Sequence, residues 1–145
     1  MNGNLEETIR WITKADHDLG TSLITYLHIP AFRDTVTFHC QQSVEKYLKA
    51  FLVFYGVEFK FTHDLIYLLE LISKIDDFLG NYFENILKLQ NYAVEVRYPD
   101  ETIFLTNERV IEAITTSQSV RKIILDKLNI QVKYHEIIDK RFVAE

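Results

Sequence analysis

One stretch decides the fold: Phe38-His39-Cys40-Gln41-Gln42-Ser43-Val44-Glu45-Lys46-Tyr47-Leu48-Lys49-Ala50-Phe51-Leu52. At 100° per residue, a broad arc of a helix collects six mainly apolar side chains, which are Cys40, Val44, Tyr47, Leu48, Phe51 and Tyr55. The other side carries the polar residues Gln42, Glu45, Lys46 and Lys49. The pattern predicts a helix with a wide buried face, which other helices must cover, and Gly56 is expected to end it.

The composition favours a single all-α domain over residues 1–145. The chain has 145 residues, 48% of them hydrophobic, but only four Gly and two Pro. So little turn-forming material argues against the many tight turns of an all-β fold. A chain of this length with this apolar content can bury a sizeable core.

The net charge and the single cysteine limit which ligands and which chemistry we expect of the protein. The formal net charge of −5 gives no general attraction to phosphate backbones, so non-specific nucleic-acid binding would need a local basic patch. The single cysteine, Cys40, lies on the apolar arc and is expected to be a reduced core residue rather than a nucleophile.

The longest apolar run, Ala50 to Val57, is far short of the roughly 20 residues that span a bilayer. With no signal-peptide pattern at the start, we expect a soluble cytoplasmic protein without a membrane segment.

Apolar periodicity predicts four further helices around the deciding one, which itself is expected to run from about Pro30 to about Tyr55. The first covers about residues 4–27, the third starts at an expected N-cap, Thr62, the fourth covers about residues 81–97, and the fifth starts at the cap Thr106 and ends near Leu128. Residues 129–145 fit strand and helix periodicity equally, and we expect a short helix or mobile tail there. The fold class is therefore an up-and-down antiparallel bundle of about five helices, with its core over about residues 5–128.

Two charged residues interrupt apolar faces. Asp16 occupies an apolar position of the first helix, so it lies either at the edge of an interface or beside a partner from elsewhere. Arg97 falls in line with the apolar face of the fourth helix, where a guanidinium needs a carboxylate or a phosphate. Two interpretations of Arg97 stay open: with Tyr98 and Asp100 it lines a polar pocket for a nucleotide or a partner segment, or it forms an internal ion pair, for example with Asp16.

Four blocks of the sequence, in this order and spacing, resemble the HEPN domain (higher eukaryotes and prokaryotes nucleotide-binding). They are Trp11…Ala15…Asp18-Leu19, Gln41-Gln42-Ser43-Val44-Glu45-Lys46-Tyr47-Leu48-Lys49-Ala50, Thr62-His63-Asp64-Leu65…Leu68-Leu69 and Val96-Arg97-Tyr98-Pro99-Asp100. The resemblance implies an all-α bundle, commonly a homodimer. Many small prokaryotic members accompany a separate minimal nucleotidyltransferase. Others are metal-independent ribonucleases, often toxins, whose signature is an Arg separated from a His by four to six residues.

The ribonuclease signature is incomplete in this chain. Arg97 stands at the family position, but no His follows it before the next helix. The bare spacing recurs at Arg10 with His17 and at Arg33 with His39, both away from the family position. No metal-ligand spacing and no Gly-rich phosphate loop occurs, so we expect neither a metal nor another cofactor.

Three hypotheses follow. The first is a non-catalytic HEPN-type subunit that binds nucleotide or substrate and partners a nucleotidyltransferase, in some cases as a toxin–antitoxin pair. Its candidate ligand or partner residues are Arg97, Tyr98, Asp100, Asp16, Gln42, Lys46 and Lys49. The second is a ribonuclease toxin that uses Arg33 with His39 or Arg10 with His17. The third is a dimeric scaffold without a ligand.

Overall fold

The computed structural model describes residues 2–95 and 105–143. Within these ranges the chain forms five α-helices, two short 3-10 helices and no strand. The α-helices are α1 (Asn2–His28), α2 (Arg33–Phe54), α3 (Leu65–Ser73), α4 (Phe83–Glu95) and α5 (Asn107–Leu128), and the 3-10 helices are η1 (Gly80–Tyr82) and η2 (Glu136–Asp139). The predicted all-α bundle is confirmed.

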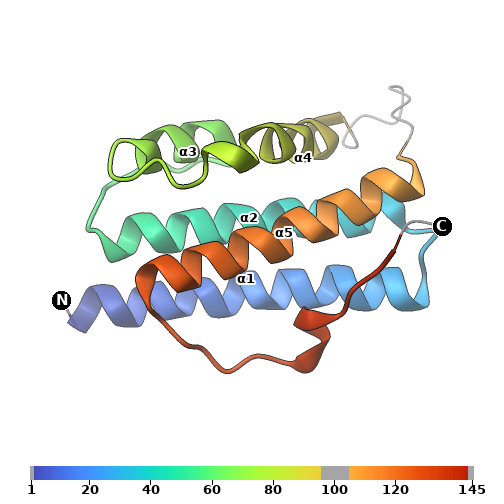
Figure 1. Cartoon of the computed structure of the whole chain (residues 1–145), viewed down its shortest axis with the longest axis horizontal. Helices are drawn as coiled ribbons and strands as arrows, with labels where there is room; N and C mark the ends of the chain where they lie inside the picture. The colour runs from blue at the N-terminus through green and yellow to red at the C-terminus, as the bar shows by residue number, and fades with distance from the viewer. Residues whose placement is uncertain (1, 96–104, 144–145) are drawn as a thin grey trace.

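The helix that decides the fold, α2, lies at the centre of the bundle. In Figure 1, α2 and α5 form the middle layer, α1 lies below them, and α3 and α4 lie above. Helix α2 packs against all four of the other helices. Contacts with four helices also bury part of the polar side of α2: Glu45 and Lys49 are 3% and 4% exposed, whereas Gln42 and Lys46 are partly exposed. The expected burial of Tyr55 is wrong, because this residue is 48% exposed at the end of α2.

The core is built from large apolar side chains of every α-helix. Fully buried examples are Leu19 and Leu23 of α1, Phe51 of α2, Leu68 of α3 and Ile86 of α4. Each such side chain stabilises the fold by roughly 1.5–3 kcal/mol relative to an exposed one. Cys40 is buried in this core, as the sequence predicts.

Two helix starts show how local sequence sets the helix boundaries. Asp64, not the predicted Thr62, is the N-cap of α3: its Oδ1 accepts from the backbone N–H groups of Ile66 and Tyr67, at 3.0 and 3.2 Å. The Thr62 hydroxyl instead accepts from the N–H of Asp64, at 3.0 Å, and so holds the cap residue itself. The predicted cap of α5 is confirmed, because the Thr106 hydroxyl accepts from the N–H of Arg109.

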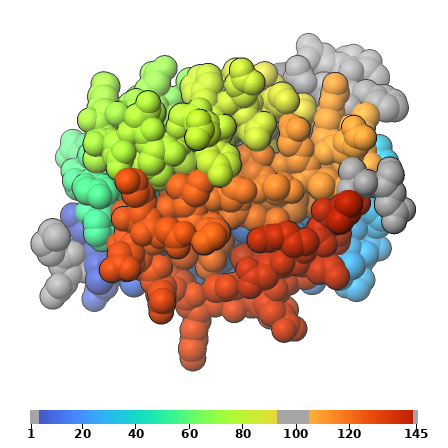
Figure 2. All heavy atoms as spheres, in the orientation of Figure 1, coloured from blue at the N-terminus to red at the C-terminus, as the bar shows by residue number. Residues whose placement is uncertain are grey.

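Residues 130–143, which we call the C-terminal strap, return across the bundle. Helix α5 ends at Leu128, and its C-cap residue Asn129 adopts the left-handed conformation with φ of 54°. The strap then crosses in front of α1 (Figure 1), and Figure 2 shows its dark red atoms lying over the blue atoms of α1. The amide of Gln118 on α5 donates to the backbone oxygens of Ile138 and Lys140, at 3.0 and 2.6 Å. Ile138 is buried in the core, so the expected short helix appears as the single turn η2 within a packed segment.

Candidate functional site

A buried charged group links α1, α2 and α5. Arg121 donates through Nε to Asp16 Oδ1 at 2.8 Å and through Nη2 to Asp16 Oδ2 at 3.1 Å. The Tyr47 hydroxyl also donates to Asp16 Oδ1. Asp16 is 7% exposed and pairs with Arg121 on α5. Of the two expected placements, the partner from elsewhere is therefore confirmed and the edge of an interface is wrong.

The electrostatics of this group favour a charged pair beside a neutral phenol. Burial, and then the charge and hydrogen bond of Asp16, raise the pKa of Tyr47 well above its usual value of 10.0. Burial alone lowers the pKa of Arg121, but the hydrogen bonds and charge of Asp16 outweigh it, and the net pKa is raised. Because its acceptor positions are already occupied, Asp16 acts as a structural anion that fixes α1 against α5.

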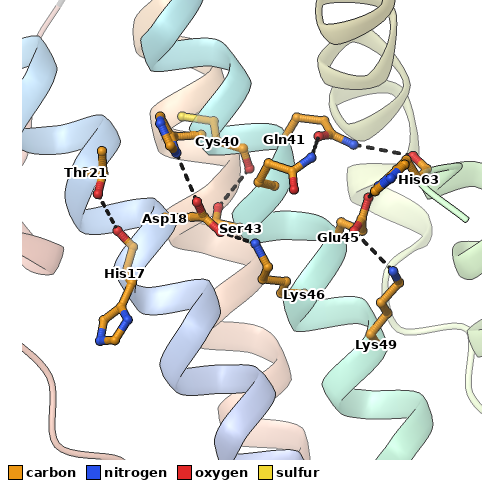
Figure 3. Close-up of polar contacts among 12 residues, drawn as sticks. His17, Asp18, Thr21, Cys40, Gln41, Ser43, Glu45, Lys46, Lys49 and His63 are labelled. Atoms are coloured by element: carbon orange, nitrogen blue, oxygen red, sulfur yellow. Dashed lines mark hydrogen bonds and ion pairs between the residues drawn. The ribbon is translucent and has the colours of Figure 1, made fainter. Parts of the chain in front are cut away.

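A second carboxylate organises the surface between α1 and α2. Asp18 Oδ1 lies 2.9 Å from His39 Nδ1, and Asp18 Oδ2 accepts from Lys46 Nζ. The side chains of Asp18, His39 and Lys46, which we call the Asp18 cluster, are 17%, 26% and 21% exposed. Figure 3 shows Asp18 reaching from α1 toward Lys46 on α2. Since Asp18 holds the Nδ1 edge of the imidazole, the Nε2 edge faces away from it and can meet a ligand.

A third carboxylate, Glu45, lies further along α2 and is nearly enclosed. Glu45 Oε2 lies 3.1 Å from Lys49 Nζ, and Glu45 Oε1 lies 2.8 Å from His63 Nδ1 (Figure 3). The ammonium of Lys49 lies 5.4 Å from the ring centre of Trp11 and 5.8 Å from that of Phe59, distances typical of cation–π contacts. Lys49 is thus enclosed by the protein, and it joins α2 to the segment between α2 and α3.

The two spacings that match the ribonuclease signature do not form Arg–His pairs. Arg33 donates through Nη1 to the backbone oxygen of Leu105 at 2.8 Å, whereas His39 is held by Asp18. Arg10 and His17 are both exposed on α1, two turns or about 10 Å apart. Figure 3 shows the ring of His17 pointing away from Asp18. The remaining candidates, Arg97, Tyr98 and Asp100, lie outside the described residues.

Sequence reasoning missed the carboxylates that connect the candidates. Asp18 and Lys46 both occur in the blocks that resemble the HEPN domain, and that co-occurrence is the signal that could have joined them. Tyr47 was predicted only as a core residue, because helical periodicity does not show which polar atom its hydroxyl meets.

The described part of the chain contains neither a cluster of metal ligands nor a membrane-spanning helix. No group of three or more His, Cys, Asp or Glu side chains there could hold a metal ion. None of the helices in residues 2–95 and 105–143 combines the length and apolar character needed to cross a bilayer.

The arrangement of helices and the blocks on α1, α2 and α3 agree with a comparison against protein families. The model of the HEPN domain matches residues 8–135, which is most of the chain. No curated protein and no solved structure matches the sequence. The matched range extends from α1 through α5 to the start of η2, and the chain therefore belongs to the HEPN domain family.

Proposed function

We propose that this chain is a non-catalytic, single-domain HEPN subunit that binds a nucleotide or a nucleotide-bearing substrate and works with a separate minimal nucleotidyltransferase. In this proposal the partner supplies the catalytic metal and phosphoryl-transfer chemistry, for which the chain has no recognisable motif. A toxin–antitoxin pair is one form that such a two-protein system takes. The working unit of the subunit is a homodimer.

The Asp18 cluster is the observation that carries this proposal. His39 and Lys46 share one face of α2 with Gln42, because the three are spaced at i, i+3 and i+7. All three side chains are partly exposed. Lys46 and His39 offer N–H donors for phosphate oxygens, and Gln42 offers an amide for a base or sugar. Asp18 holds the side chains of His39 and Lys46 in place before a ligand arrives, which lowers the entropy lost on binding.

The same geometry favours binding over cleavage. General acid–base cleavage of RNA needs a His and a phosphate-stabilising cation that both reach the same reacting phosphodiester. Arg33 is about 240° around the helix axis from His39 and is held by Leu105. Under the ribonuclease hypothesis, His39 would therefore have to act with Lys46 instead of Arg33. Under the hypothesis of a scaffold without a ligand, the Asp18 cluster would have no binding role.

The sequence-based pocket of Arg97, Tyr98 and Asp100 belongs to the proposal as a second contact region. Arg97 is proposed to bind phosphate or a partner segment, because Asp16, the carboxylate suggested as its internal ion-pair partner, is paired with Arg121 instead. We expect Arg97→Ala to weaken ligand or partner binding while leaving the unfolding midpoint nearly unchanged. A large loss of stability with intact binding would contradict this assignment.

Calorimetric titration with ATP and GTP tests the binding proposal. We expect Lys46→Ala and His39→Ala each to weaken nucleotide binding about tenfold, the effect of losing roughly 1.4 kcal/mol. Lys122→Ala is the matched control, because Lys122 is exposed on α5 and its ion pair within the described residues is with Asp126. Equal affinity in all variants would overturn the nucleotide site. Cleavage of RNA by the purified chain, lost in His39→Ala, would establish the ribonuclease alternative instead.

Co-elution tests the partner and the homodimer. We expect the chain to sediment as a dimer at micromolar concentration and to co-elute with a small nucleotidyltransferase encoded beside it. Separate elution of the two proteins would overturn the partnership, and a monomer at that concentration would overturn the homodimer.

A further inference from the structure

A groove of about 960 Å³ runs between α1 and the C-terminal strap. One wall is a single face of α1, on which Thr13, His17, Thr21 and Ile24 follow each other at three- and four-residue intervals. The other wall is the strap from Lys133 to Ile138. This volume lies in the range of pockets that enclose small organic ligands.

The groove combines an apolar floor with hydrogen-bond donors. Gly20 lies on the floor beside two isoleucines, since a methyl group there would be in van der Waals contact with Ile137 Cγ2 and Ile138 Cδ1, at 3.6 and 3.8 Å. Ile24 and Tyr134 are 44% and 46% exposed. Exposed side chains of this size on the two walls of one groove can cover the apolar body of a ligand.

The polar groups of the groove favour a negatively charged ligand. His17 and Lys133 lie on opposite walls, and both are exposed. His135 Nδ1 accepts from the N–H of Ile137 at 3.0 Å, so in the neutral ring the proton is on Nε2, which is a donor. Asp16 is the only carboxylate among the described lining residues, and Arg121 and Tyr47 already occupy it.

We infer that this groove binds a small organic anion with an apolar body, for example an aromatic or aliphatic carboxylate, sulfonate or phosphate ester. Lys133 and His17 bind the anionic group from opposite walls, and Ile24, Tyr134 and Ile137 contact the apolar body. The net charge of −5 gives the chain no general attraction for anions, so binding of an anion here depends on the groups that line the groove.

This site is distinct from the Asp18 cluster. His17 and Asp18 are neighbours on α1, but the two side chains point to different sides of that helix (Figure 3). The groove also contains no residue of α2 among its described lining. Loss of nucleotide binding at Lys46 would therefore leave the groove intact, and the two proposals fail independently.

Two fluorescent probes of the same shape test the inference. The first, 8-anilinonaphthalene-1-sulfonate, has an aromatic body and a sulfonate, and N-phenyl-1-naphthylamine has the same body without the charge. We expect the folded chain to bind the sulfonate at one site and more tightly than the neutral probe. Backbone NMR shifts should move at Gly20, Thr21, Ile24 and in residues 133–138.

Charge reversal on the strap separates specific binding from general attraction. We expect Lys133→Glu to weaken binding of the sulfonate at least tenfold and to leave binding of the neutral probe unchanged. Lys140→Glu is the matched control, since it makes the same change on the same strap outside the groove, and we expect it to have less than a twofold effect. His17→Ala should weaken sulfonate binding several-fold, and His28→Ala, beyond the groove on α1, should not.

Several results would overturn the inference. These are equal loss of sulfonate binding in Lys133→Glu and Lys140→Glu, NMR shifts confined to other surfaces, or equal affinity for the two probes. Tighter binding of a hexaglutamate peptide than of the sulfonate would also overturn it, because the occupant would then be an acidic peptide. Near-ultraviolet circular dichroism of each variant confirms that the native packing is retained, so that loss of binding is not loss of fold.

Discussion

Arg121 on α5 holds Asp16 on α1 through two hydrogen bonds, of 2.8 and 3.1 Å, in a position where both side chains are nearly enclosed. Both charged groups lose their bound water on burial, and the hydrogen bonds between them take its place. Removing one partner leaves an uncompensated charge, whereas removing both leaves no buried charge and only the neutral Tyr47 hydroxyl without its acceptor. The energetic role of the pair can therefore be measured by comparing single with double substitutions.

We expect Asp16→Leu to lower the free energy of unfolding by about 3–5 kcal/mol, because the guanidinium of Arg121 would remain buried without its anion. Asp16→Leu combined with Arg121→Met should cost much less. Urea denaturation followed by circular dichroism measures both. The control is Lys122→Ala, which breaks an exposed pair with Asp126 and should cost at most about 1 kcal/mol. A double variant as unstable as the single one would contradict this account.

The thiol of Cys40 should be slow to react while the protein is folded. Burial raises the pKa of Cys40 from 9.0 to about 11, with opposing contributions from Ser22 and Ser117. Few molecules carry a thiolate at pH 8, and the group is not accessible. We expect Ellman's reagent to react far more slowly with the native protein than with protein in guanidinium chloride. Complete reaction of the native protein within the mixing time would contradict the burial.

The same group predicts how stability changes in alkaline solution. Between pH 9 and 11 the unfolded thiol loses its proton while the folded thiol keeps it, so the folded state binds more protons and stability falls as pH rises. The contribution of the protonated Cys40 thiol to the free energy of unfolding is fully present below pH 9. We expect Cys40→Ala to show a shallower decline of unfolding free energy over this range than the wild type. Identical slopes would contradict the raised pKa.

The sequence predicts the helical bundle well, because the apolar periodicity that marks the buried face of each helix lies within the residues of that helix. It also predicts Thr106 as a cap, since the hydroxyl and the N–H group of Arg109 that donates to it are only three residues apart. The pairing of Asp16 with Arg121 was not predictable, because it depends on the relative rotation of two helices far apart in sequence. The enclosure of Lys49 was not predictable either, since the rings of Trp11 and Phe59 come from other segments.

The start of α3 offers a local test of helix capping. Asp64 accepts two backbone N–H groups of α3, whereas Thr62 accepts only the N–H of Asp64. We expect Asp64→Ala to lower the unfolding free energy by about 1 kcal/mol. Thr62→Ala should cost less, because it leaves the orphan N–H groups of the helix satisfied. Thermal denaturation of the two variants measures the difference, and a larger effect of Thr62→Ala would reverse the assignment.

The strap should loosen when Gln118 is shortened. The amide of Gln118 is nearly buried and donates to two strap carbonyl groups, which Gln118→Ala would leave without their donor. We expect tryptic cleavage after Lys140 and Arg141 to become several-fold faster, with little change in cleavage after Lys88 of α4. Ser119→Ala, one residue along on α5, is the control. Unchanged cleavage in Gln118→Ala would show that Ile138 and its apolar neighbours hold the strap without this hydrogen bond.

The distance along the chain between Asp16 and Arg121, 105 residues, has a consequence for how the bundle assembles. Helices α1 and α2 are joined by a short connection and can associate early, because closing a short loop costs little entropy. In an assembly of these two helices alone, the Asp16 carboxylate would meet the Tyr47 hydroxyl but would lack its counter-charge, which comes from α5. Partly folded forms are thereby penalised until α5 docks, and we expect folding to be cooperative, with a single kinetic phase and no populated intermediate.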